Sequence, residues 1–250
     1  MSTPFHVIIP ARFQSTRFPG KLLQELNGFT VIERVYRQVL LAQAQSITIA
    51  TDTESIAEHA RGFGAEVIMT LPSHQTGTDR IAEVVAKGNY AADDIIVNVQ
   101  GDEPFISPLL IQQVAQGLIH TDAPMSTLCW PITSLDLLKN PNVVKVVRNR
   151  DNHALYFSRS IIPANREDGL SFEHTFRHIG LYAYRAAFLL DFVTWPVCEL
   201  ERLEALEQLR VLWAGYSIKV EQACVEPLQD INTKEDLIRA RQNLAASLDQ

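Results

Sequence analysis

A stretch of twelve residues near the start of the chain is rich in groups that bind anions. Residues 10–21 read PARFQSTRFPGK and contain three cations, Arg12, Arg17 and Lys21. A loop of this composition, which also carries the hydroxyl of Ser15, can direct backbone N–H groups and fixed positive charge at a polyphosphate. It is not a Walker A loop, because Ser15 stands where that motif has a glycine. A solvated basic surface loop is the alternative interpretation.

An acidic turn ends a strongly apolar run further along the chain. Residues 98–104 read NVQGDEP and follow the run DIIV. Mg²⁺ is a hard ion that binds carboxylate oxygens together with the phosphate oxygens of a substrate, so Asp102 at the end of a strand is a natural magnesium ligand. The alternative is a turn in which the aspartate and the glycine serve backbone geometry alone.

The segment 74–80, which reads HQTGTDR, leads into a helical pattern. One interpretation is structural, with a threonine hydroxyl capping the first turn of the helix. A functional interpretation adds Gln75 as a contact for a nucleobase and Arg80 as a contact for an anion. A capping threonine is compatible with both interpretations, so the cap does not decide between them.

Polar residues in the second half of the chain also have two interpretations. Arg159 and His178 could together hold a carboxylate, although a surface arginine and a structural histidine are the ordinary alternative. His174 and His178 are four residues apart, but the strand-like pattern around them does not favour a zinc site. Glu207 and Gln208 lie in a helical segment whose charges are most simply a solvated face.

The apolar pattern of the first 120 residues supplies a scaffold for these segments. Short apolar runs predict strands at 5–9, 46–50, 65–69 and 94–99, and helical periodicity predicts helices at 31–40, 54–61, 81–86 and 108–118. This alternation predicts an α/β fold with a doubly wound sheet flanked by helices. Because ligands gather at the carboxyl ends of parallel strands, the segments that begin at residues 10, 51 and 100 are expected on one edge.

The pattern changes after residue 122. Shorter strands are predicted at 125–130, 143–147, 154–157 and 179–184, followed by a helix at 200–213, a strand at 217–220 and a helix at 235–245. We therefore expect three parts. They are an α/β core at 1–122, an antiparallel β insertion at 123–185, and C-terminal helices and a strand at 186–250 that complete the core.

Composition limits the classes of function. The 250 residues include 22 lysines and arginines against 29 aspartates and glutamates, a net charge of −7, so nucleic acid is not an expected partner. The three scattered cysteines fit neither a disulfide framework nor a zinc site. Without a long apolar run or a signal peptide, the chain is predicted to be cytoplasmic, with no membrane insertion. The absence of G-x-G-x-x-G disfavours a nicotinamide-dependent oxidoreductase.

Eight strings follow one another between residues 8 and 213: IIPARFQSTRFPGKLL, ATDTE, HQTGTDRIAEV, IIVNVQGDEP, NPNVVKVV, ALYFSRSIIP, FRHIGLYAYR and LEALEQLRVLW. In this order and spacing they resemble the 3-deoxy-manno-octulosonate cytidylyltransferases, also called CMP-Kdo synthetases. Each string alone is a weak signal. The combination of VQGDEP, ALYFSR and FRHIGLYAYR in one chain is highly specific.

The resemblance implies an enzyme that transfers CMP from CTP to 3-deoxy-D-manno-octulosonate (Kdo), giving CMP-Kdo and pyrophosphate for lipopolysaccharide synthesis. It implies Mg²⁺ as the cofactor, a nucleotidyltransferase-type mixed sheet and a homodimer. The core at 1–122 would bind the nucleotide, and the insertion at 123–185 would serve sugar binding and dimerisation.

The resemblance also implies roles for single residues. Arg12, Ser15 and Lys21 would bind the phosphates of CTP, and Arg12, Lys21 and Asp102 would be catalytic, with Asp102 as the Mg²⁺ ligand. The other substrate contacts would come from Gln75, Arg80 and Gln100 around cytidine and part of the sugar, and from Arg159, His178, Glu207 and Gln208 around Kdo.

The chain departs from the family pattern near its C-terminus. The family typically has Val-Asp-Thr-x-Glu-Asp-Leu there, with the first aspartate as a second Mg²⁺ ligand, whereas this chain reads INTKEDL from residue 231. Asn232, which replaces that aspartate, offers a neutral oxygen. Asp230 would point to the same side in an extended segment. We hypothesise that Asp230 compensates, or that Asn232 binds the metal more weakly.

Three other functions are compatible with parts of the sequence. The same chemistry could act on an 8-amino analogue of Kdo or on another acid sugar such as a sialic acid, and the pocket residues do not separate these substrates. A nucleotide-binding protein without turnover is a further alternative. The retained Arg12, Lys21 and Asp102 argue against it.

Overall fold

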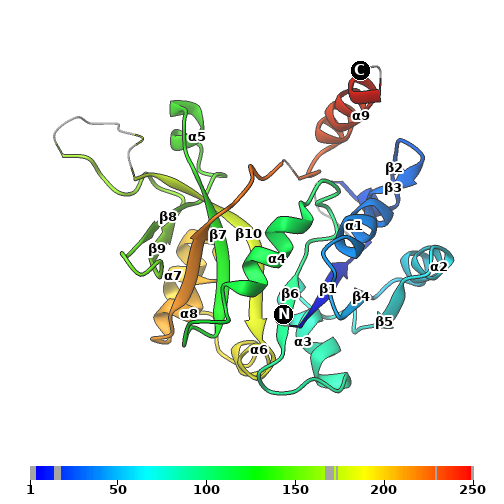
Figure 1. Ribbon diagram of the computed structural model, residues 1–250, viewed down its shortest axis with the longest axis horizontal. Coiled ribbons are helices and arrows are strands. Elements are labelled where there is room, and N and C mark those ends of the chain that lie inside the picture. Colours follow the sequence, from blue (N-terminus) through cyan, green and yellow to red (C-terminus); the bar gives the residue numbers. More distant parts are fainter. Residues whose placement is uncertain (1–3, 14–17, 167–171, 173, 229, 249–250) are drawn as a thin grey trace.

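One mixed sheet forms the centre of the protein (Figure 1). The computed structural model describes residues 4–13, 18–166, 172, 174–228 and 230–248. The strands lie in the order β11-β7-β10-β6-β1-β4-β5, with β8 and β9 branching from β10. Their bounds are β1 Phe5–Ala11, β4 Ser46–Thr51, β5 Glu66–Met69, β6 Ile95–Asn98, β7 Met125–Pro131, β8 Lys145–Arg148, β9 Ala154–Ser158, β10 Phe176–Arg185 and β11 Ile218–Gln222.

Parallel pairing dominates one half of this sheet. Strand β1 is parallel to β4 and β6, and β4 is parallel to β5. Strand β10 is antiparallel to β6, β7 and β8, whereas β11 runs parallel to β7. The predicted α/β fold with a doubly wound, mixed sheet is confirmed. The strands predicted for 123–185 extend the central sheet, and only β8 and β9 leave its main path.

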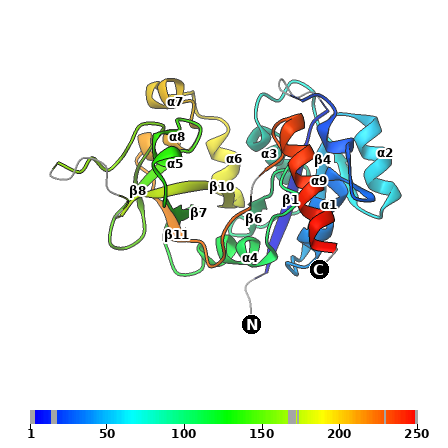
Figure 2. The same ribbon diagram turned by 90° about the horizontal axis from the view of Figure 1, so that it is seen from above.

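Helices cover both faces of the sheet (Figure 2). The helices are η1 Lys21–Leu23, α1 Val31–Leu40, α2 Glu54–Gly62, α3 Gly77–Lys87, α4 Pro108–Gln116, α5 Leu135–Lys139, α6 Ala186–Phe192, α7 Glu199–Glu204, α8 Leu209–Trp213 and α9 Lys234–Leu248. Residues of α1, α2, α4 and α9 pack on one face, and residues of α3, α6 and α8 pack on the other. A small separate hairpin pairs β2 Glu25–Leu26 with β3 Phe29–Thr30.

Capping chemistry sets the start of the helix nearest the expected site. The hydroxyl of Thr76 accepts from the backbone N–H of Asp79 at 3.0 Å, and the carboxylate of Asp79 accepts from the backbone N–H of Thr76 at 3.1 Å. This reciprocal capping box satisfies two backbone donors at the start of α3. The helix therefore begins at Gly77, four residues before the predicted start at Ile81.

The helix predicted for 200–213 is wrong in one respect, because the chain breaks within it. Ala205 takes a left-handed conformation, with φ at +49°, and separates α7 from α8. Apolar periodicity continues across this residue, so the sequence pattern gave no sign of the break. The short α5, α6 and the β2–β3 hairpin were also not predicted, since elements this short carry little periodicity.

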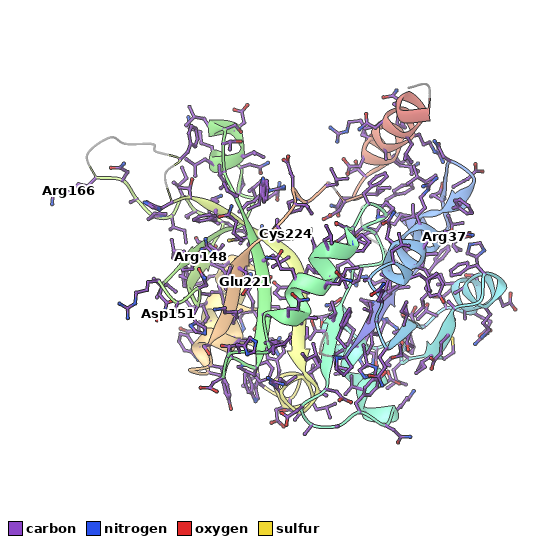
Figure 3. The ribbon with its side chains drawn as sticks, viewed as in Figure 1. Arg37, Arg148, Asp151, Arg166, Glu221 and Cys224 are labelled. Atoms are coloured by element: carbon purple, nitrogen blue, oxygen red, sulfur yellow. The ribbon has the colours of Figure 1, made fainter. Side chains whose placement is uncertain are left out.

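The β8–β9 hairpin lies off the main path of the sheet and joins it where β8 pairs with β10. Its strands pair antiparallel, and the guanidinium of Arg148 lies 4.6 Å from the centre of the Phe176 ring. Asp151, at the turn of the hairpin, and Arg166, on the following segment, project away from the body of the protein (Figure 3). Polar groups thus cover the outer end of this part of the chain.

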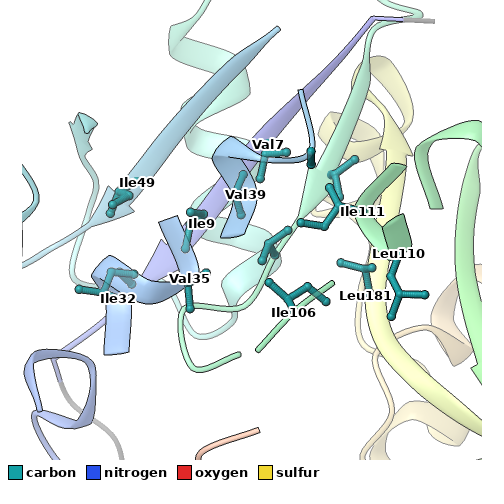
Figure 4. Packing of buried hydrophobic residues seen from close by; sticks show 14 of the residues in the cluster. Val7, Ile9, Ile32, Val35, Val39, Ile49, Ile106, Leu110, Ile111 and Leu181 are labelled. Atoms are coloured by element: carbon teal, nitrogen blue, oxygen red, sulfur yellow. The ribbon is translucent and has the colours of Figure 1, made fainter. Parts of the chain in front are cut away.

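Alternation along β1 divides the core between the two faces. Val7 and Ile9 point to the face that α1 covers with Val35 and Val39 (Figure 4). Ile8 points to the opposite face, where it joins residues of α3 and α6. Successive side chains of a strand point to opposite faces, so one apolar run contributes to both layers. Among the described residues, no helix is long and apolar enough to cross a membrane.

We predict that Ile9→Ala destabilises the protein by about 2–4 kcal/mol, because it leaves a cavity in a fully buried layer. Urea denaturation followed by circular dichroism measures the change. Leu40→Ala on α1 is the matched control, since Leu40 is 51% exposed and its loss should change the free energy of unfolding little. Equal effects of the two substitutions would contradict the packing described here.

Candidate active site

A cavity of about 290 Å³ lies at the carboxyl ends of β1 and β6. It is lined by Pro10, Ala11, Arg12, Lys21, Leu22, His74, Thr76, Gly77, Arg80, Gln100, Gly101 and Asp102. Parallel strands bring the basic segment and the acidic turn to the same edge, as the sequence predicted. The cavity thus gathers cations, an amide and a carboxylate from segments far apart in the chain.

Three segments that are far apart in the sequence are held together by contacts among Lys21, Asp102 and Ile231, which we call the Lys21 cluster. The ammonium of Lys21 contacts the carboxylate of Asp102 and donates to the carbonyl of Ile231 at 3.2 Å. The backbone N–H of Ile231 donates to the carbonyl of Asp102 at 3.0 Å. The C-terminal string around Asn232 is therefore held beside the acidic turn.

Gly101 permits this close approach. A Cβ at this position would lie 3.0 Å from the carbonyl oxygen of Pro10 and 3.3–3.4 Å from side-chain carbons of Ile32 and Leu22. A Cβ here would force its neighbours to shift by a few tenths of an ångström, so the glycine lets β1 and the acidic turn meet closely.

Three carboxyl groups, those of Asp102, Glu103 and Asp230, lie close together at the Lys21 cluster. Burial, followed by the charge of Asp102, raises the pKa of Asp230 to about 6. Burial also raises the pKa of Glu103 well above its usual range, as do Asp230 and Asp102. A cation placed here would relieve this mutual repulsion. Glu103, which lies next to Asp102 in the chain, was not predicted as a site residue.

The side-chain oxygens offered at the Lys21 cluster fit Mg²⁺. The oxygens of Asp102, Asp230 and Asn232 are hard ligands, and Mg²⁺ commonly takes only one or two carboxylates, with phosphate and water completing its shell. In the described part of the chain, no group of three or more His, Cys, Asp and Glu side chains could by itself hold a metal. The residues therefore suit an ion shared with a phosphate ligand better than a closed protein cage.

The segment before α3 places His74 at the cavity and Gln75 at the surface. Gln75, predicted as a substrate contact, is exposed, and its amide donates to the carbonyl of Ser73 at 2.9 Å. His74 lines the cavity instead, and its imidazole contacts the carboxylate of Glu83. The chain turns at the capping residue Thr76, which directs Gln75 to solvent.

Arg80 borders the cavity, but most of its charge is already paired. Its side chain is buried, donates to Asp52 Oδ2 at 2.7 Å and contacts the hydroxyl of Thr70. These contacts tie α3 to the ends of β4 and β5. Arg80 therefore has a structural role that the sequence did not reveal, in addition to its predicted role as a substrate contact.

Arg159 is held differently from the predicted sugar contact. Its guanidinium donates to the carbonyls of Glu204 at 2.5 Å, Pro141 at 3.0 Å and Ala205 at 3.2 Å. The carboxylate of Glu204 in turn accepts from the backbone N–H of Arg159 at 2.8 Å. In the structure the guanidinium therefore stabilises the left-handed turn at Ala205. These bonds use three of the five N–H groups of the guanidinium, so the predicted carboxylate contact would have to use the remaining two.

His178 is half-buried, and its ring is held in the neutral form. Its Nε2 lies 3.0 Å from the hydroxyl of Thr127, and its ring packs against Phe157 and Tyr182 at centroid distances of 5.0 and 5.4 Å. Burial lowers its pKa to about 3. It borders a second cavity of about 300 Å³, which also contains Arg177.

Glu207 and Gln208 carry buried polar atoms without a hydrogen-bond partner in the described structure. Glu207 Oε2 accepts from the hydroxyl of Thr78 at 3.0 Å, but Oε1 accepts no hydrogen bond and lies 3.6 Å from Arg210 Nη2. The amide nitrogen of Gln208 also has no partner. Buried polar groups are rarely left unsatisfied, so these two atoms favour a polar ligand. Burial raises the pKa of Glu207 to about 7.

Comparisons with known proteins match nearly the whole chain. Residues 6–221 match a family model described as cytidylyltransferase. The chain is 72% identical over 242 residues to the 3-deoxy-manno-octulosonate cytidylyltransferase of Legionella pneumophila (strain Lens), covering 97% of each protein. It is 48% identical to the protein of that name in Vibrio vulnificus (strain CMCP6), covering 97% of this chain and 98% of the relative. The chain belongs to the 3-deoxy-manno-octulosonate cytidylyltransferase family.

A solved structure agrees with this membership. It is described as CMP:2-keto-3-deoxy-manno-octonic acid synthetase complexed with CTP, and it is 35% identical to this cytidylyltransferase. The two structures superpose with a TM-score of 0.91, covering 98% of this chain and all of the other.

Two groups of predicted site residues emerge in this cytidylyltransferase. Arg12, Lys21, Gln100 and Asp102 meet at the first cavity, whereas His178 lies on β10 and Glu207, which precedes Gln208, lies close to Tyr182 and Tyr184 of the same strand. Ser15 lies outside the described residues. Glu103 could have been predicted as a site residue from its position next to Asp102. The contact between His74 and Glu83 could not, because it joins residues nine apart across the turn that precedes α3.

We predict that the imidazole of His178 stays neutral between pH 5 and pH 8, because burial depresses its pKa to about 3. The depressed pKa means that His178 contributes stability above the ordinary histidine value of 6.5, and this contribution is lost as the pH falls toward 3. The chemical shift of its Cε1 carbon, assigned with a His178→Gln variant, should be constant from pH 5 to pH 8. A titration midpoint inside that range would contradict the prediction.

Proposed function

We propose that this cytidylyltransferase transfers CMP from CTP to Kdo, releasing pyrophosphate and giving CMP-Kdo for lipopolysaccharide synthesis. The observation that carries the proposal is the meeting of Arg12, Lys21, Gln100 and Asp102 at one cavity in a chain of this family. Relatives of this name cover nearly the whole chain, so both proposed subsites lie within the matched region.

The proposed reaction is a direct displacement at phosphorus. The anomeric hydroxyl of Kdo attacks the α-phosphorus of CTP, the new O–P bond forms, the bond to the β-phosphate oxygen breaks, and the hydroxyl proton is lost to solvent. Such a step depends on in-line positioning and on neutralising charge rather than on a covalent enzyme intermediate. Arg12 and Lys21 would stabilise the charge that builds up on the leaving pyrophosphate.

We propose Mg²⁺ as the cofactor, held by Asp102 and by Asp230 or Asn232. When bound, the ion would neutralise phosphate charge and lower the pKa of the attacking hydroxyl. Lys21 would keep the Asp102 carboxylate oriented through the contact described above. The raised pKa values of Asp230 and Glu103 support a cation at this place.

Kdo would lie against the unsatisfied polar atoms of Glu207 and Gln208. Neutral His178 could exchange hydrogen bonds with a sugar hydroxyl, while Arg159 would shape the site by holding the turn that precedes Glu207. The same groups could accept an 8-amino analogue of Kdo, so the sugar assay should include it.

A homodimer is proposed as the working assembly. Large apolar side chains are exposed on β9 and α7, where Leu155 is 62% and Leu203 is 81% exposed. Contiguous apolar patches on a surface commonly mark an interface, and the proposal is that these two leucines belong to such a patch. Sedimentation equilibrium that finds only monomer at micromolar concentration would reject the proposal. The cytoplasmic location stays a prediction.

The deciding experiment measures pyrophosphate release with CTP, Kdo and Mg²⁺, with ATP, GTP and UTP as controls. We expect release only with CTP, and only when both Kdo and Mg²⁺ are present. Faster pyrophosphate release with the 8-amino analogue would show that this analogue, and not Kdo, is the preferred sugar, and the proposed reaction would stay the same. Binding of CTP without release with any acid sugar would leave a nucleotide-binding protein without turnover.

We predict that Asp102→Asn lowers turnover by about 100-fold or more, because it removes a carboxylate that would hold the Mg²⁺ ion neutralising the reacting phosphates. Asp151→Asn is the matched control, since Asp151 is a hairpin residue with a side chain 65% exposed. Circular dichroism should show both variants folded. A mild kinetic effect of Asp102→Asn would count against Asp102 as the metal ligand.

We predict that Asn232→Asp reduces the Mg²⁺ concentration needed for half-maximal turnover several-fold, because a carboxylate neutralises more metal charge than an amide oxygen does. Titration of turnover with Mg²⁺ measures the change. Asn89→Asp adds the same charge to an exposed loop and should have no effect. An unchanged Mg²⁺ dependence in Asn232→Asp would remove Asn232 from the metal site.

A further inference from the structure

Two carboxylates lie beside one buried guanidinium, and only one of them is bonded to it. The Nε of Arg210 donates to Glu201 Oε2 at 2.8 Å, and its Nη2 donates to Glu201 Oε1 at 2.9 Å. Glu207 Oε1 lies 3.6 Å from the same Nη2, which is too far for a hydrogen bond. The charge of Arg210 is therefore committed to Glu201 rather than to Glu207.

Further contacts fix the guanidinium of Arg210 in this position. Its Nη1 donates to the carbonyl of Trp195 at 3.1 Å, and its central carbon lies 4.7 Å from the centre of the Phe192 ring. An arginine that meets a carboxylate through two parallel N–H bonds is held more firmly and in a more defined direction than one held by a single bond. The side chains of Arg210 and Glu201 are 8% and 11% exposed, so salt screens this pair little. The guanidinium is thus held just beyond the reach of Glu207.

The arrangement leaves one oxygen of Glu207 open. Oε2 accepts from the hydroxyl of Thr78 at 3.0 Å, whereas the buried Oε1 accepts no hydrogen bond from the described residues. Leaving a buried polar atom without a partner costs free energy. A shift of Arg210 by about half an ångström would satisfy this oxygen. The pairing with Glu201 is what opposes that shift.

We propose that Glu201 is a positioning residue for the sugar. By binding the guanidinium of Arg210 through both carboxylate oxygens, it keeps Glu207 Oε1 open to accept a hydrogen bond from a hydroxyl of the acid sugar. Glu201 acts through Arg210 and does not contact the sugar itself. The inference rests on the proposed function, because it takes Glu207 as a sugar contact.

The first test is Glu201→Gln, which keeps the size of the side chain and removes its charge. An amide has only one oxygen to accept with, so it cannot accept from both N–H groups of Arg210. Arg210 would then turn to Glu207, the other carboxylate within 4 Å of its guanidinium, and occupy Oε1. We expect the KM for the acid sugar to rise about tenfold or more, because a hydrogen bond to a charged group is lost. The KM for CTP should stay unchanged, and kcat should change less than about threefold.

The second test is the double variant Glu201→Gln/Arg210→Gln, which removes the guanidinium as well. Two amides can hydrogen-bond to each other, and no cation is left there to occupy Glu207 Oε1. The KM for the sugar should return to within about threefold of the wild-type value, which is the non-additivity expected of residues in contact. If Glu201 served stability alone, the double variant would be at least as impaired as the single one.

Steady-state pyrophosphate release measures these values with the acid sugar that the wild type uses. The assay is run at about pH 8.5, above the pKa of about 7 to which burial raises Glu207, so that its carboxyl group is ionised. Glu199→Gln is the matched control, because it makes the same change at an exposed position of α7 and should alter neither KM. If Glu201→Gln does not unfold cooperatively, a crystal structure of the wild type with a 2-deoxy analogue of the sugar decides. It should show a sugar hydroxyl on Glu207 Oε1, with Arg210 still on Glu201.

Three results would overturn the inference and leave the proposed function standing. They are a wild-type KM for the sugar in Glu201→Gln, a double variant as impaired as the single one, and a sugar complex in which Arg210 is bonded to Glu207. A wild type that releases no pyrophosphate from CTP with any acid sugar would overturn the function and the inference together.

Discussion

The contact between the ammonium of Lys21 and the carboxylate of Asp102 joins parts of the chain that are 81 residues apart. Lys21 also reaches Ile231, so one cation holds the basic segment, the acidic turn and the C-terminal string at one place. The pair is largely shielded, with side-chain exposures of 12% and 23%. Removing one partner of such a pair leaves an uncompensated charge, which is costly in a protein interior.

The charges that line the nucleotide cavity are opposite in sign to the net charge of the protein. The chain carries a net charge of −7, yet Arg12, Lys21 and Arg80 all border the nucleotide cavity. Directly behind them, Asp230 and Glu103 hold their carboxyl groups in surroundings that disfavour ionisation. Phosphate and a divalent cation together complement both sets of charges, whereas either alone would complement only one.

Periodicity in the sequence predicted the strands of the parallel half and the shared edge of the basic segment and the acidic turn, but it did not predict the order of the strands in the sheet. Alternating strands and helices up to residue 122 required β1 and β6 to end at one edge, so the gathering of Lys21 and Asp102 followed from the sequence. The break at Ala205 could not be predicted, because the carbonyls that it exposes are stabilised by Arg159 from another part of the chain. The exposure of Gln75 could not be predicted for a similar reason, since its direction depends on the turn at Thr76, and its role as a substrate contact stays a prediction.

The most direct test of this account is a crystal structure of the protein with CTP and Mg²⁺. The account predicts the triphosphate against Arg12 and Lys21, the metal between a phosphate oxygen and Asp102, and the base near Gln100. A nucleotide bound instead in the cavity around Arg177, or a metal that does not contact Asp102, would contradict it.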